Sequence, residues 1–117
     1  MAALRGRIGM PLRIELAEGE TLSFTRKYLL RPSRSPLADA DLSSRASALA
    51  AQIVESLDAD WAVRIDLIHE RSSDRLLVLE CDAAPLIGAQ SAFAASLSAA
   101  KMSRREQLQL LLSAPSR

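Results

Sequence analysis

The sequence has little that would favour binding to nucleic acids or membrane surfaces. Its 15 Lys and Arg residues against 14 Asp and Glu residues leave a net charge of +1, so no long-range field attracts phosphate backbones or anionic lipids. Aromatic residues make up 3% of the 117 residues, which leaves almost no platforms on which nucleic-acid bases could stack. We therefore expect neither a nucleic-acid partner nor a membrane partner.

Cysteine and long apolar runs are equally scarce. Cys81 is the only thiol, which excludes a disulfide within the chain and any multi-cysteine zinc or iron–sulfur centre. No stretch reaches the ~18 consecutive apolar residues that a membrane-spanning helix needs. Residues 1–10 also lack the apolar segment of a secretory signal. These absences favour a cytoplasmic protein.

Aliphatic residues are plentiful, and their spacing predicts the secondary structure. Hydrophobic residues make up 49% of a chain of 117 residues, which predicts one domain over 1–117 with an aliphatic core. Alternating apolar residues indicate strands, and apolar residues three and four apart indicate helices. Strands are predicted over 12–16, 22–29, 61–69 and 75–82, a proline-containing loop over 31–36, and helices over 39–57, 91–100 and 103–113. The fold class is therefore α+β, with a mostly antiparallel sheet of about four strands and about three helices packed on one face.

The strands over 61–69 and 75–82 are predicted to form a hairpin, because a short polar segment over 72–74 separates them. With that turn, Asp66 lies opposite Glu80 and Arg64 lies opposite Asp82, all on one face. The other face carries Trp61 and Cys81 with aliphatic neighbours, and we expect it to pack on the helices.

Three carboxylates and one guanidinium on one face leave a local charge near −2. Two like charges at ~4 Å cost on the order of 4 kcal/mol at an effective dielectric of ~20. A divalent cation with oxygen ligands, Mg²⁺ above all, removes that cost. In the alternative interpretation, Arg64 pairs with Asp82, and Asp66 and Glu80 are ordinary solvated side chains.

The order and spacing of these residues resemble the C-terminal end of D-alanine–D-alanine ligases, which belong to the ATP-grasp superfamily. The family pattern is R-[IV]-D, a hairpin, [LF]-x-E-x-N-x-x-P-G, a serine, and a helix opened by [LM]-S. Residues 64–66, 79–85, 91 and 102–103 follow that order, with Asp82 at the usual asparagine. Residues 11–15 and 27–28 fall where these ligases carry P-L-x-x-E and K-Y. The chain is thus similar to a partial ATP-grasp C-terminal subdomain.

The resemblance implies a metal site on the hairpin. Asp66 and Glu80 would bind Mg²⁺ (or Mn²⁺) and bridge it to the triphosphate of ATP. Asp82 would serve as a further ligand, because a carboxylate can bind the metal as the usual asparagine does. Arg64 would act as a catalytic residue that stabilises the transferred phosphoryl group or the tetrahedral intermediate.

The resemblance also implies contacts to nucleotide and substrate. Lys27 would contact the terminal phosphate of ATP and take part in catalysis, and Tyr28 would open a loop that covers the site. Ser91 would hold the carboxylate of the acceptor amino acid or dipeptide. The implied reaction is ATP-dependent activation of a carboxylate as an acyl phosphate, followed by amide formation in peptidoglycan precursor synthesis.

Two departures from the family pattern limit this expectation. Leu86 replaces the glycine that normally follows the motif proline, and the N-terminal part of such ligases, with its glycine-rich phosphate loop, has no counterpart in the sequence. We therefore expect weak Mg²⁺–ATP binding and negligible turnover unless a partner polypeptide supplies the missing part. The alternative is a catalytically silent remnant that acts as an interaction domain. A homodimer is compatible with either interpretation.

Overall fold

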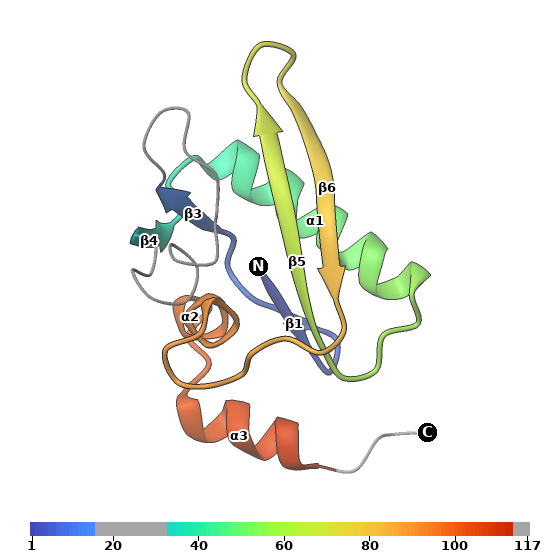
Figure 1. The fold of residues 1–117 in the computed structure, drawn as a ribbon, viewed down its shortest axis with the longest axis vertical. Helices are drawn as coiled ribbons and strands as arrows, with labels where there is room; N and C mark the ends of the chain where they lie inside the picture. The colour runs from blue at the N-terminus through green and yellow to red at the C-terminus, as the bar shows by residue number, and fades with distance from the viewer. Residues whose placement is uncertain (16–32, 114–117) are drawn as a thin grey trace.

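The computed structural model describes residues 1–15 and 33–113, and in this part of the chain the fold is α+β (Figure 1). Strands β2, β1, β5 and β6 form, in that order, an antiparallel sheet of four strands, and β3 pairs with β4 in a second, two-stranded sheet. This arrangement confirms the predicted class. The elements are β1 (Ala2–Leu4), β2 (Arg7–Ile8), β3 (Leu12–Glu15), β4 (Ser33–Pro36), α1 (Ala40–Ser56), β5 (Ala62–Glu70), β6 (Arg75–Asp82), α2 (Ala92–Ala99) and α3 (Arg104–Leu112).

The N-terminal third of the chain differs from the prediction. Ser33–Pro36 forms β4 and pairs with β3, although its two serines and its proline are typical of a loop. Strands β1 and β2 were not predicted, because Ala2–Leu4 is buried at all three positions and shows no alternation. The strand predicted over 22–29 lies outside the described residues.

The three helices begin at the capping residues that the sequence indicates. The side-chain oxygens of Asp39, Ser91 and Ser103 accept hydrogen bonds from backbone amides three residues later, at 3.0, 3.1 and 3.2 Å. Each bond satisfies an amide that has no partner within its helix. Within residues 1–15 and 33–113, none of the helices has the length and apolar character needed to cross a bilayer.

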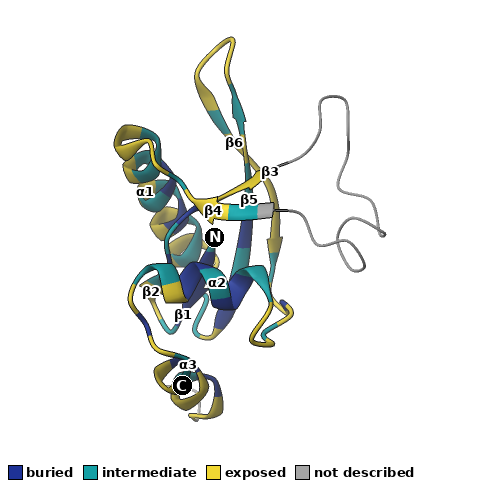
Figure 2. Cartoon of the chain, turned by 90° about the vertical axis from the view of Figure 1, so that its left-hand side faces the viewer, coloured by how far each residue is buried: buried dark blue, intermediate teal, exposed yellow. Residues whose placement is uncertain are grey.

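The core has two parts, because β5 buries side chains on both faces. Val63 and Ile65 pack with Ala50 of α1, whereas Ala62 packs with residues of α2 and α3. Neighbouring residues of a strand point to opposite faces, so α1 lies on one face and α2 and α3 lie on the other (Figure 2). The single helical face expected from the sequence is thus divided in two, and Phe93 of α2 anchors the second part.

Ser96 joins α2 to the start of the chain. Its buried hydroxyl accepts a hydrogen bond from the Ala2 amide at 2.9 Å and donates one to the Met10 carbonyl at 2.7 Å. The Met10 amide in turn donates to the Ser96 carbonyl at 2.9 Å. This close approach requires a glycine at position 9, because a Cβ atom there would overlap the Ser96 hydroxyl and lie 3.0 Å from its carbonyl carbon and oxygen.

We expect Gly9→Ala to lower the free energy of unfolding by about 1–3 kcal/mol, since α2 must move to relieve the overlap. Gly88→Ala is the matched control, because a Cβ there meets no atom within 4 Å. Urea denaturation of the two variants measures the difference. Equal stability of both variants would show that Gly9 and Ser96 are not packed as described.

Candidate functional site

The predicted cluster of charged residues forms at the base of the β5–β6 hairpin. Arg64 pairs with Asp82 and Asp66 pairs with Glu80, as the sequence predicts. Directly opposed residues of an antiparallel pair share a face, so all four side chains lie on the same side of the sheet. We call these four residues the acidic cluster. The shared face that the metal-site hypothesis requires is therefore present, but within residues 1–15 and 33–113 no three His, Cys, Asp or Glu side chains converge closely enough to hold a metal ion.

A β-bulge changes the register in the other half of the hairpin. Leu67 pairs with Val78, so Leu79 is the extra residue on β6. The register predicted from the turn is consequently wrong between the bulge and the tip. The turn spans residues 71–74 rather than 72–74, and the extra residue at the bulge restores the predicted pairing at the acidic cluster.

Arg64 is the centre of the acidic cluster. Its Nε and Nη2 atoms donate to Oδ1 and Oδ2 of Asp66 at 2.9 and 3.0 Å, a bidentate pair along one strand. The distances from the guanidinium to a carboxylate oxygen of Glu80 and of Asp82 are 3.9 and 3.8 Å. The simple alternative is confirmed for the ion pair of Arg64 with Asp82 and wrong for Asp66, which accepts both hydrogen bonds of the guanidinium.

The acidic cluster surrounds a largely buried guanidinium with more exposed carboxylates. The Arg64 side chain is 12% exposed, while those of Asp66, Glu80 and Asp82 are 30%, 54% and 30% exposed. Its hydrogen bonds to Asp66, above all, raise the pKa of Arg64, with the other carboxylates adding to the effect. Arg64 is therefore always cationic, and the four side chains keep a formal charge of −2.

The Arg64–Asp66 bond is the feature of the site that sequence reasoning missed. The sequence predicts a partner for Arg64 on the opposite strand, whereas Asp66 stands two residues from Arg64 on β5 itself. A signal was present, because residues two apart on a strand share a face and the long arginine side chain can reach back along it.

Ser91 holds the start of α2. Its Oγ atom accepts from the Ala94 amide at 3.1 Å and donates to the Gly88 carbonyl at 2.6 Å. Its hydroxyl proton is thus already used within the chain. Nearby, Nη2 of Arg34 donates to the Gln90 carbonyl at 2.8 Å and links β4 to the loop before α2. Lys27 and Tyr28 lie outside the described residues.

Two predictions about apolar side chains are wrong. Cys81 is exposed rather than buried, because β6 is the outermost strand of the sheet. Trp61 is 41% exposed, and its indole Nε1 donates to the Leu111 carbonyl at 3.3 Å rather than lying within the core. The ion pairs of the acidic cluster involve neither residue, so neither is assigned to the site.

The tip of the hairpin carries a second polar group, which fastens it to α1. Oδ1 of Asp74 lies 2.8 Å from Nε2 of His69 and 3.0 Å from Nη1 of Arg45. The hydrogen bond with His69 first, and then that with Arg45, lowers the pKa of Asp74. Arg45 also donates to the Asp74 backbone carbonyl at 2.6 Å. This group explains His69 as a structural residue.

Comparisons with known proteins add no family to this geometry. A scan against protein-family models, a search of curated proteins and a search of solved structures each found no match to the chain.

Proposed function

We propose that the chain is the Mg²⁺- and ATP-binding C-terminal part of an ATP-grasp enzyme similar to D-alanine–D-alanine ligase. Such an enzyme would form an amide bond in peptidoglycan precursor synthesis in the cytoplasm. The observation that carries the proposal is the direct pairing of Asp66 with Glu80 on one face. These are the two carboxylates to which the resemblance assigns the metal.

The chemistry of the cluster suits a hard divalent cation. Asp66, Glu80 and Asp82 offer only oxygen donors, which Mg²⁺ and Mn²⁺ prefer, and Arg64 leaves two negative charges uncompensated. Glu80 is the most exposed of the three carboxylates and has the longest contact to Arg64. We therefore assign the first metal contact to Glu80, and a contact from Asp66 once Arg64 releases it.

Arg64 has the role of exchanging partners in this proposal. A guanidinium forms the same two-bonded fork with phosphate as with carboxylate, so it can turn from Asp66 to phosphate oxygens of ATP. Its raised pKa keeps it charged throughout. Bound Mg²⁺–ATP would supply a phosphoryl group to a substrate carboxylate, with ADP leaving, and the attacking amine would then release phosphate. Lys27 and Tyr28 remain the proposed contacts to the terminal phosphate and the covering loop.

Ser91 can bind a substrate carboxylate only by changing its hydrogen bond. Its hydroxyl proton is donated to Gly88, so a carboxylate must replace that carbonyl as the acceptor. The bond from the Ala94 amide can stay, because a hydroxyl oxygen has two lone pairs. Ser91 is therefore compatible with substrate binding while it still caps α2.

A second function, that of a catalytically silent interaction domain, is supported by a different aspect of the same site. Both oxygens of Asp66 are held by Arg64, so an internal ion pair already compensates part of the charge. A chain that kept the cluster only for stability would look the same at this point. Metal binding distinguishes the two functions.

Isothermal titration of Mg²⁺–ATP, and of Mg²⁺ alone, into the full chain tests the proposal. We expect Asp66→Ala/Glu80→Ala to weaken binding by about tenfold or more, which is ~1.4 kcal/mol or more. The matched control is Asp41→Ala/Glu55→Ala, which removes two carboxylates from α1 and should leave binding unchanged. Absence of binding to the wild type, or equal loss in both double variants, would refute a metal–nucleotide site in the cluster.

A further inference from the structure

β6 is an open edge of the sheet. In the described part of the chain it is hydrogen-bonded to β5 on one side only. Edge strands are usually protected by lysine, proline or covering segments, but β6 contains neither residue and has the sequence Arg-Leu-Leu-Val-Leu-Glu-Cys-Asp. Val78 and Leu79 are 45% and 65% exposed. The bulge at Leu79 and the charged residues Arg75, Glu80 and Asp82 protect parts of this edge, and four ladder residues remain on the tip side of the bulge.

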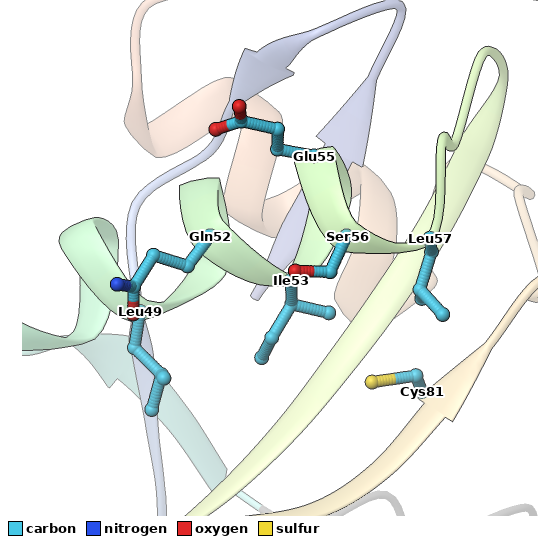
Figure 3. A pocket seen from close by; sticks show the side chains of 7 residues that line it. All are labelled: Leu49, Gln52, Ile53, Glu55, Ser56, Leu57 and Cys81. Carbon is cyan, nitrogen blue, oxygen red and sulfur yellow. The ribbon is translucent and has the colours of Figure 1, made fainter.

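Helix α1 extends beyond this edge. In Figure 1 it crosses behind β5 and β6, and its C-terminal half projects past β6. An open groove of about 600 Å³ lies between that half of the helix and Cys81. Figure 3 shows Leu49, Ile53 and Leu57 directed towards the groove from α1 and Cys81 directed towards it from β6. Helix α1 therefore extends far enough beyond β6 to cover one further strand.

If a two-fold axis relates two copies of the chain, the groove of one copy can receive the exposed part of β6 of the other. Val78 and Cys81 lie on the α1 face, since their partners Leu67 and Ile65 do. The groove lies at the Cys81 end of β6, whereas Val78 lies in the tip half and stays exposed. Antiparallel pairing of β6 with a second β6 reverses its direction. Val78 of each copy is thereby brought over the groove of the other.

Charge favours the same arrangement on the opposite face. Arg75 pairs with Glu70 at the tip end of the hairpin, whereas Glu80 and Asp82 stand at the other end. All of them lie on the face of the acidic cluster, because the alternation along β5 places Glu70 with Asp66. Arg75 keeps its ion pair with Glu70 but is 63% exposed, so an antiparallel copy brings its guanidinium beside the two carboxylates, and it does so twice.

We propose that the free edge of β6, with the overhanging half of α1, is the interface of a homodimer in which two β6 strands pair antiparallel. The sheet then continues through both copies, and each α1 covers the tip half of the other copy's β6. A second copy is the occupant that these observations favour, because α1 and Cys81 form the groove while β6 itself carries Val78, Arg75 and the two carboxylates that an antiparallel copy would meet. The proposal does not rest on the proposed function, but the two share Glu80 and Asp82, so Arg75 of a second copy and a metal ion would compete for these carboxylates.

Sedimentation equilibrium of the full chain tests the dimer. An interface of this limited extent predicts a weak dimer, so the mass should rise from 12.7 kDa towards twice that value over about 1–100 µM. Val78→Lys and Leu57→Lys alter opposite sides of the same contact, and each should weaken association about tenfold or more. Leu112→Lys is the control, because that side chain is 85% exposed on α3. Circular dichroism checks that each variant is folded.

Amide hydrogen exchange identifies the surface that is used. We expect backbone amides of β6 that point away from β5 to exchange more slowly at high protein concentration than at low concentration. A wild type that stays monomeric over this range overturns the proposal, even if it binds a different polypeptide. A dimer that resists both substitutions, or that leaves the β6 amides unprotected, uses another surface and overturns it as well.

Discussion

Replacing Arg64 with methionine is expected to lower the free energy of unfolding by about 2–3 kcal/mol, because two charged hydrogen bonds are lost and three neighbouring carboxylates are left without a cation. Methionine keeps most of the length of the buried stem, so the loss reflects charge more than volume. Thermal and urea denaturation at neutral pH measure it. Arg75→Met is the control, because Arg75 pairs with Glu70 at an exposed position and should change stability by less than about 1 kcal/mol.

The same variant separates the two interpretations of the cluster. Without Arg64, the carboxylates Asp66, Glu80 and Asp82 keep a charge of −3 and compete with no internal cation. Millimolar Mg²⁺ should then raise the melting temperature of Arg64→Met more than that of the wild type, since ligand binding to the folded state alone stabilises it. An equal response in the two proteins would mean that the three carboxylates do not converge on a cation.

Phe93→Ala is expected to have the larger effect on stability, a loss of about 3–5 kcal/mol. Phe93 is 1% exposed and packs with Leu4 and Leu97, so its removal leaves a cavity between α2 and the sheet. A small domain has a total stability of only ~5–15 kcal/mol, and the variant should be partly unfolded at 37 °C. Urea denaturation followed by Trp61 fluorescence measures the loss.

Leu112→Ala is the matched control for Phe93→Ala, because it removes an apolar side chain that is 85% exposed. It should change stability by less than about 0.5 kcal/mol. A loss below about 1 kcal/mol for Phe93→Ala would contradict the assignment of this side chain to the core.

Sequence patterns predicted correctly those features that depend on a single helix or a single hairpin. The positions of the three helices, the cap at Ser103 and the pairing of Asp66 with Glu80 follow from spacing along the chain. The position of a strand within the sheet does not. Cys81 was expected in the core because it shares a face with Ile65, and it is exposed because no described strand lies beyond β6.

The chemistry of the site was predictable in its composition but not in its internal pairing. The face that the four charged residues share was predicted correctly because the bulge at Leu79 compensates for the turn, which spans residues 71–74 rather than 72–74. Which carboxylate Arg64 prefers depends on the reach of one flexible side chain, and hydrophobic periodicity carries no information about that. The roles of Lys27 and Tyr28 stay predictions, because these residues lie outside the described part of the chain.

The place of β1 in the sheet has a consequence for how the protein acquires its structure. This strand, near the first residue, lies between β2 and β5, and the bond from the Met1 nitrogen to the Ile65 carbonyl joins positions 64 residues apart. Closing so long a loop is entropically slow, and topologies of this kind fold more slowly than those built from local contacts. During synthesis, Ala2 and Leu4 must stay exposed to solvent until β5 has left the ribosome. The interior of the sheet therefore assembles late and in one step.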